Sequence, residues 1–166
     1  MKRLYISLLF VFAFTLNYAQ EHLPLGNTQF NAGVGLSKWG VPVYFGLDYS
    51  LQHNITIGAE IAYSYYNENF HNEYYGHNIT SFSGNMNYHF NTALAIPNDF
   101  DLYGGFNIGF YSWTSPAGYN GSYTSGLGIG AQIGARYYVT RKVGLNMEFG
   151  GGNEFVGGKF GVSIRL

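Results

Sequence analysis

The feature that most restricts how this chain can fold is a strict alternation of apolar residues with small or polar ones. The clearest case runs from Leu127 to Val139, where Leu, Ile, Ala, Tyr and Val occupy the odd-numbered positions and Gly, Gln, Arg and Tyr the even-numbered ones. Successive side chains of a β-strand point to opposite faces. The segment therefore predicts a strand with one apolar face.

Seven further segments alternate in the same way, which predicts eight strands in all. Their apolar faces contain no Lys, Arg, Asp or Glu. No stretch after the N-terminal region approaches 18 consecutive apolar residues, so a membrane helix is not expected there. The eight segments cover residues 31–37, 43–51, 55–65, 82–90, 102–110, 127–139, 143–149 and 159–166.

Composition agrees with an all-β chain. Charged residues make up only 10%, aromatic residues 19%, and there are 24 glycines. Disordered chains are poor in aromatics and rich in charge, and glycine and aromatics are indifferent or poor helix formers. Cysteine is absent, which excludes a disulfide scaffold, a cysteine zinc site and a thiol nucleophile.

The connections between the segments differ in length. Residues 52–54 and 140–142 are predicted to be tight turns, whereas Tyr66–Asn78 and Trp113–Tyr123 are predicted to be long polar loops. Outer-membrane barrels have short periplasmic turns and longer outer loops. A periplasmic N-terminus would place both long loops outside, although the short connection Ser37–Gly40 and the long one Asn91–Asp99 fit this pattern less well.

The composition of the polar faces distinguishes a membrane barrel from a soluble β-sandwich. A soluble sandwich would expose Lys, Glu and Thr to water on its polar face. Here Gly, Asn, Ser and Tyr dominate, and the few charges balance. Eight strands enclose an interior just wide enough for side chains, where unpaired charges are costly. We therefore predict a network of paired charges in the lumen. Its members are Asp48, Glu60, Arg136, Glu148, Lys159 and Arg165.

Two further patterns support a membrane environment. Aromatic residues cluster near the strand ends, as in the girdles at membrane interfaces. The apolar faces lack charge, and a Lys or Arg in mid-membrane costs ~2–4 kcal/mol. We predict an all-β fold, an eight-stranded antiparallel up-and-down transmembrane β-barrel.

The N-terminal residues predict export. Lys2 and Arg3 precede the apolar stretch Leu4–Leu16, and Ala19 offers a small residue at a cleavage point. This is the pattern of a secretory signal peptide. A membrane anchor is disfavoured because the apolar stretch is shorter than the ~20 residues that a spanning helix needs. We predict a signal peptide over residues 1–19 and an outer-membrane barrel domain over residues 20–166.

The last segment resembles the C-terminal signal of outer-membrane proteins, in which a polar residue and a glycine precede alternating apolar residues. The matching positions here are Lys159, Gly161, Ile164 and Leu166. The usual terminal residue in those proteins is Phe, whereas this chain has Leu. An ordinary alternating strand is the other interpretation.

Together these features resemble the small eight-stranded outer-membrane β-barrels of the OmpA/OmpX type, over about residues 27–166. The resemblance implies an integral protein of the Gram-negative cell outer membrane, in contact with lipid, folded by the barrel-assembly machinery and monomeric. A peptidoglycan-binding domain, which the OmpA proteins carry after the barrel, is not expected. Members of this group serve in envelope integrity, adhesion or defence.

No enzyme motif is found among the five histidines. Lipid A deacylase barrels carry a lipid-facing His-x-Ser pair. The nearest match, His89-Phe90-Asn91, lacks the serine, and His89 falls on the lumen face. We therefore predict that the protein is not an enzyme and has no catalytic residues.

Ligand-binding motifs are equally weak. His71, His77, Glu68 and Glu73 in the first long loop could bind a metal, but a solvated anionic loop tip fits better, so no metal site is predicted. Gly126–Gly130 is not followed by a predicted helix, which excludes a dinucleotide fingerprint, and no cofactor is expected. There is no basic run for nucleic acid.

The sequence thus favours a membrane-embedded scaffold that presents residues 66–78 and 113–123 to an extracellular ligand, because loops rich in Tyr and Asn are typical contact surfaces. A small-solute channel is an alternative, although Tyr44, Tyr103 and Tyr138 look bulky enough to fill the lumen. A lipid-modifying enzyme is a second, less favoured alternative.

Overall fold

The computed structural model describes residues 23–70, 73–121, 124–153 and 157–166. The predicted signal peptide and its cleavage point after Ala19 lie outside these residues. Within the described part of the chain, no helix is long and apolar enough to cross a membrane.

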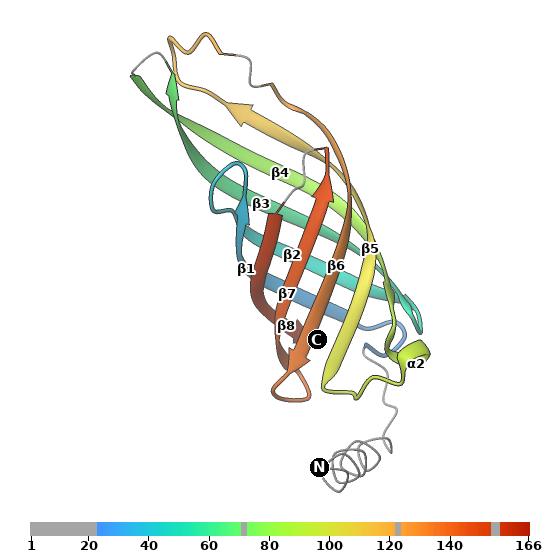
Figure 1. The fold of residues 1–166 in the computed structure, drawn as a ribbon. Coiled ribbons are helices and arrows are strands. Elements are labelled where there is room, and N and C mark those ends of the chain that lie inside the picture. Colours follow the sequence, from blue (N-terminus) through green and yellow to red (C-terminus); the bar gives the residue numbers. More distant parts are fainter. Residues whose placement is uncertain (1–22, 71–72, 122–123, 154–156) are drawn as a thin grey trace, which may run out of the picture.

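The described residues form a closed barrel of eight antiparallel strands, which confirms the predicted fold (Figure 1). Each strand pairs with the next in the sequence, and β1 pairs with β8 from Gln29↔Arg165 to Ser37↔Gly157 to close the cylinder. The strands are β1 Thr28–Ser37, β2 Val43–Gln52, β3 Ile55–Phe70, β4 Glu73–His89, β5 Phe100–Thr114, β6 Gly126–Tyr138, β7 Val143–Gly152 and β8 Gly157–Arg165.

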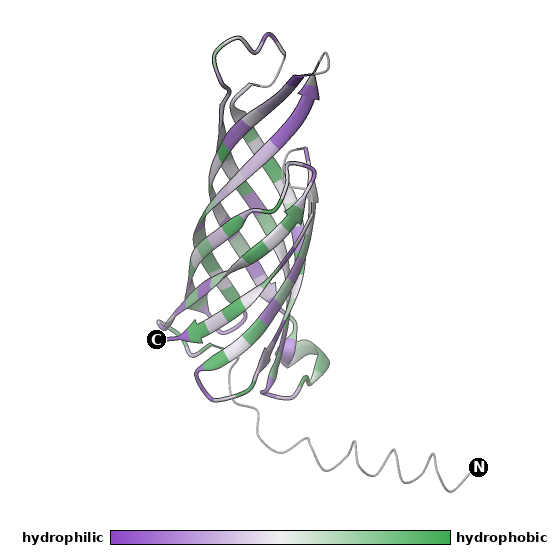
Figure 2. Cartoon of the chain, turned by 90° about the vertical axis from the view of Figure 1, so that its left-hand side faces the viewer, coloured by the Kyte–Doolittle hydropathy of each residue, from purple (hydrophilic) through white to green (hydrophobic). Residues whose placement is uncertain are grey.

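The barrel exposes its apolar residues and buries its polar ones. Phe106 is 73% exposed and Leu127 68% exposed, whereas Asn31, Asp48 and Arg136 are buried inside. Figure 2 shows the result as bands of alternating hydropathy along the strands. Exposed apolar surface on this scale would be unfavourable in water, so the outer face requires lipid. The alternation in the sequence follows from this arrangement, because successive side chains of each strand face lipid and lumen in turn.

The two ends of the barrel differ. The end formed by connections 53–54, 90–99 and 139–142 is called here the turn end, and the opposite end the loop end. The turn end includes the short helix α2 Asn91–Leu94, which ends at Ala95 in the left-handed region with φ 49°. At the loop end, β3, β4 and β5 extend beyond the other strands (Figure 1).

The prediction of a long loop over residues 66–78 is wrong, because β3 and β4 continue as a paired hairpin from Tyr66↔His77 to Phe70↔Glu73. Similarly, β5 includes Trp113 and Thr114. The alternation fades in these extensions because both faces of a strand beyond the membrane meet polar surroundings. The sequence signal for a strand is lost there although the backbone pairing continues.

Candidate functional site: the lumen and the loop end

Arg136 on β6 lies at the centre of a buried ion cluster. Its guanidinium is 3.0 Å from Asp101 on neighbouring β5 and 2.7 Å from Asp48 on β2 across the lumen. It also lies 4.3 Å from the ring centroid of Tyr103. Asn31 donates a further hydrogen bond of 2.9 Å to Asp48. The cluster ties strands on opposite sides of the barrel together.

Asp101 extends this cluster to His89 and Thr56. The Asp101 carboxylate is 2.7 Å from Nδ1 of His89, whose Nε2 is 3.0 Å from the Thr56 hydroxyl. The order of these groups matches that of hydrolytic triads. Thr56 and His89 are fully buried, however, and neither lines the two lumen cavities described below. A substrate in those cavities would not meet the hydroxyl.

Asp101 and Thr56 are not among the site residues that the sequence predicts. Asp101 shares the inward alternation of Tyr103 and directly precedes the predicted strand, so extending that strand by one residue would have revealed it. Thr56 was placed on an inward face, but its contact with His89 depends on the pairing of β3 with β4, in which Thr56 lies opposite Asn87.

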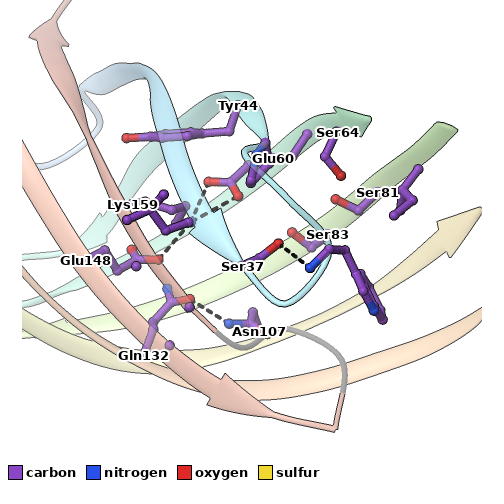
Figure 3. A pocket seen from close by; sticks show the side chains of 18 of the residues that line it. Ser37, Tyr44, Glu60, Ser64, Ser81, Ser83, Asn107, Gln132, Glu148 and Lys159 are labelled. Atoms are coloured by element: carbon purple, nitrogen blue, oxygen red, sulfur yellow. Dashed lines mark hydrogen bonds and ion pairs between the residues drawn. The ribbon is translucent and has the colours of Figure 1, made fainter. Parts of the chain in front are cut away.

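Lys159 on β8 forms a second ion cluster nearer the loop end (Figure 3). Its ammonium lies 2.7 Å from Glu148 on neighbouring β7 and bonds both carboxylate oxygens of Glu60 on β3, at 3.0 and 2.8 Å. The Tyr103 hydroxyl donates a hydrogen bond of 2.9 Å to Glu148. Tyr103 therefore connects the Lys159 cluster with the Arg136 cluster.

Arg165 differs from the expectation that it pairs with a lumen carboxylate. Its guanidinium lies 3.4 Å from the ring centroid of Tyr138 and donates a hydrogen bond to the backbone carbonyl of Arg141. Among the described residues, no carboxylate lies within ion-pair distance of it. Its register partner on β1 is Gln29, which on its other side lies opposite Asp48 on β2. Asp48 is bonded instead to Arg136 and Asn31.

Among the described residues, the lumen contains a cavity of about 120 Å³ toward the loop end and another of about 20 Å³ toward the centre. Both are lined by Tyr44, Glu60, Glu148 and Lys159, so the Lys159 cluster lies between them. The smaller one is also bounded by Tyr103 and Arg136. Side chains thus fill most of the lumen.

At the loop end, the β3–β4 hairpin is bonded to the segment that follows β5. Nδ1 of the buried His77 lies 2.9 Å from the Ser115 hydroxyl, and the Tyr119 hydroxyl donates a 2.6 Å hydrogen bond to Glu68. The rings of Tyr119 and His77 are 4.6 Å apart. The two segments that the sequence predicted as separate loops therefore form one joined surface.

The hairpin tip carries an exposed pair of polar side chains. The Tyr75 hydroxyl donates a 2.7 Å hydrogen bond to Glu73. This hydrogen bond raises the pKa of Tyr75 above its ordinary value, because it favours the protonated phenol beside a carboxylate. Within the described residues, no three His, Cys, Asp or Glu side chains are grouped as a metal site would require. His71 lies outside those residues.

The connection between β1 and β2 folds over the lumen and is held there by aromatic contacts. The Trp39 ring lies 5.1 Å from Tyr111 and 5.4 Å from Trp113, both on β5. Trp39 also lines the larger cavity. Trp39 thus covers part of that cavity and is held there by Tyr111 and Trp113, and these three residues are called here the aromatic roof.

Comparison with known proteins agrees with this geometry. The family model described as an outer membrane protein β-barrel domain matches residues 6–161. No curated protein matches by sequence. OprG of Pseudomonas aeruginosa aligns with a TM-score of 0.67 and 9% identity, covering 87% of this chain and 97% of OprG.

Two other solved structures are similar. The N-terminal β-barrel domain of Pseudomonas aeruginosa OprF aligns with a TM-score of 0.58 and 14% identity, covering 86% of this chain and 98% of that domain. The attachment invasion locus protein Ail of Yersinia pestis, in complex with the heparin analogue sucrose octasulfate, aligns with a TM-score of 0.53 and 13% identity. That alignment covers 84% of this chain and 97% of Ail. At these identities the likeness concerns the fold.

Proposed function

Because the chain belongs to the outer membrane protein β-barrel family, we propose that it is a plugged barrel whose loop end is a contact surface outside the cell. The observation that carries this proposal is the bonding of the hairpin to the segment after β5 through Glu68–Tyr119 and His77–Ser115. A surface that is already ordered loses less conformational entropy when it binds a partner.

The surface chemistry favours a partner without strong negative charge. Residues 66–78 and 113–123 contain no Lys or Arg, and Tyr74 at the tip is 80% exposed. Ail was solved with a sulfated heparin analogue, but a polyanion would meet no basic side chain in these two segments. Tyr and Asn side chains supply contact area and hydrogen bonds to protein or neutral glycan.

The ion clusters argue against the alternative of a small-solute channel. A water path through the lumen would have to pass Lys159 with its two carboxylates and then Arg136 with Asp48 and Asp101. The cavity at the centre, of about 20 Å³, has room for about one water and is bounded by members of both ion clusters. We infer a barrel that is closed to ions.

We also propose that the protein is not an enzyme, that it contacts outer-membrane lipid as a monomer, and that it reaches the outer membrane by export. The sequestered position of Thr56 and His89 supports a protein without hydrolytic activity. The uncharged outer face supports contact with outer-membrane lipid, and the closed sheet supports a monomer. We further propose that export follows cleavage near Ala19 and that β8 carries the signal for the barrel-assembly machinery.

Cells that display the wild-type protein are expected to bind at least one matrix protein or neutral glycan that a deletion strain does not bind. Replacing the outward-pointing hairpin residues Asn67, Asn69 and Tyr74 by Ala should remove this binding, because it removes exposed contact side chains. The Glu68 and His77 contacts that hold the hairpin in place stay intact. Binding of intact cells to immobilised proteins and glycans is the measurement. Leu94→Ala, exposed at the turn end, is the matched control and should bind like the wild type. Equal binding by the triple variant would contradict the proposed surface.

In a planar lipid bilayer containing KCl, the purified barrel is expected to add no stepwise conductance to that of the empty membrane. The physical reason is that the two ion clusters block the lumen. Single-channel recording at both polarities is the measurement, and a porin is the positive control. Regular conductance steps from the wild-type protein would instead favour the small-solute channel.

A further inference from the structure

The larger lumen cavity is enclosed by groups of three kinds, which come from different parts of the barrel (Figure 3). Its floor is the Lys159 cluster. One wall carries the polar side chains of the central strands β3 to β6. The remaining boundary is apolar and includes Trp39, Pro42 and Ile79. The cavity lies toward the loop end, so a ligand from the exterior would reach it past the aromatic roof.

The polar wall contains hydrogen-bonding groups that the protein itself does not use. Within the described residues, the hydroxyls of Ser64, Ser81 and Ser83 form no hydrogen bond with another protein group, and all three line the cavity. Figure 3 shows their side chains at the open space. Asn107 donates a 2.7 Å hydrogen bond to Gln132, while its own Oδ1 is buried without a hydrogen-bond partner. Buried polar atoms normally have partners, so this wall fits a ligand that both donates and accepts hydrogen bonds.

The charges of the floor, in contrast, are already used. The Lys159 ammonium has three donors and forms three hydrogen bonds or ion pairs, two with Glu60 and one with Glu148. No free cation remains on the floor for an anionic ligand, and two carboxylates face one ammonium. The electrostatics therefore disfavour sulfated or carboxylated ligands and leave an uncharged ligand as the best match.

The apolar boundary restricts the ligand further. Binding sites are mostly apolar surfaces with a few placed polar groups. A polyol or sugar has the matching character, because its hydroxyls lie on the carbon edges while its C–H groups form an apolar surface that can lie against Trp39. The cavity volume of about 120 Å³ is several times the ~10–15 Å³ that is needed to hold one water. That space admits a short polyol, or one edge of a single sugar ring.

We propose that this cavity is a binding site for a neutral polyhydroxylated ligand, either a free small polyol or the terminal neutral sugar of a glycan. The hydroxyls of Ser64, Ser81 and Ser83 and the amide oxygen of Asn107 form hydrogen bonds with the ligand, and Trp39 covers its C–H face. The site is separate from the outer surface of the hairpin and does not depend on it.

The experiment uses the purified full-length protein, folded in detergent micelles and titrated with erythritol. The chain has two tryptophans, of which Trp39 lines the cavity and Trp113 contacts Trp39, so intrinsic fluorescence reports on the cavity. We expect a saturable change in tryptophan emission, with heat of binding by calorimetry as a second readout. Glycerol 3-phosphate, an anion of similar size, should give no saturable change.

Two variants test the location. Ala62→Leu fills the cavity, because Ala62 lines it, whereas Ala59→Leu adds the same volume to the exposed outer face of the same strand. Erythritol should bind at least about tenfold more weakly to Ala62→Leu, a loss of ~1.4 kcal/mol, and unchanged to Ala59→Leu. If Ala62→Leu does not fold, Ser83→Ala supplies the test, because it removes one hydroxyl without adding volume.

Each outcome is decisive. No saturable binding of erythritol or of methyl glycosides would overturn the proposal, as would equal binding by the filled or hydroxyl-deleted variant and the wild type. Binding of erythritol alone would identify a free polyol as the source. Tighter binding of neutral oligosaccharides than of their free sugars would identify a glycan terminus.

Discussion

Replacing Arg136 by Leu is expected to lower the free energy of unfolding in micelles by about 3–5 kcal/mol. The substitution keeps an elongated side chain but leaves the carboxylates of Asp48 and Asp101 buried without their common cation. Removing one member of a buried ion cluster is costly because the remaining charges lose their partner and regain no water. Urea unfolding followed by heat-modifiable gel mobility is the measurement.

Two further variants separate charge from packing. Arg141→Leu removes an arginine that is exposed at the turn end and should change stability by no more than about 0.5 kcal/mol. Adding Asp48→Asn and Asp101→Asn to Arg136→Leu should recover part of the loss, because it removes the unpaired charges. A stability of Arg136→Leu equal to that of Arg141→Leu would show that the Arg136 cluster does not hold the barrel together.

The barrel could be predicted from the sequence because lipid imposes a strong rule on every strand that crosses it. Each outward position must be apolar, so strands such as Leu127–Val139 stand out without any knowledge of their neighbours. The hairpin Tyr66–Asn78 escaped the prediction for the same reason, since the rule ends where the membrane ends. The two strands of this hairpin pair through backbone hydrogen bonds, which the side-chain pattern does not reveal.

The sequence predicts which residues face the lumen but not which of them contact one another. Alternation places Glu60 and Lys159 inside, yet they lie on β3 and β8, and only the closed cylinder brings them together. Arg165 was expected to pair with a lumen carboxylate, but Asp48, which lies one strand beyond its register partner Gln29, is paired with Arg136 from the opposite side of the lumen. The roof over the cavity depends on Trp39 in a connection without any periodic signal, so its contact with β5 had no sequence indicator.

The pairing of β1 with β8 closes the barrel, and two opposed glycines bring these strands together. Gly33 and Gly161 lie opposite each other in the register. A Cβ on Gly161 would lie 2.1 Å from the backbone oxygen of Ala32 and 2.6 Å from the Tyr44 hydroxyl. Backbone cannot yield to such a contact as a flexible side chain would. The glycine of the proposed C-terminal signal therefore also has a packing role.

Replacing Gly161 by Val is expected to prevent closure, so that heat-modifiable folded protein falls to a small fraction of the wild-type amount. Gly151→Val is the matched control, because a Cβ on Gly151 has no neighbour within 4 Å, and it should fold normally. The folded fraction is measured by gel mobility in two settings, in isolated outer membranes and after refolding into micelles without cellular factors.

The two settings distinguish packing from recognition by the assembly machinery. Gly161→Val should fail in both, because the clash with β1 is present wherever the barrel forms. Leu166→Asp places a charge near the membrane interface, where its direct cost is only ~0–1 kcal/mol, so it should refold in micelles and fail only in cells. Normal folding of Gly161→Val in micelles would refute the packing role of Gly161. Normal assembly of Leu166→Asp in cells would refute Leu166 as part of the signal and leave β8 with closure of the barrel as its role.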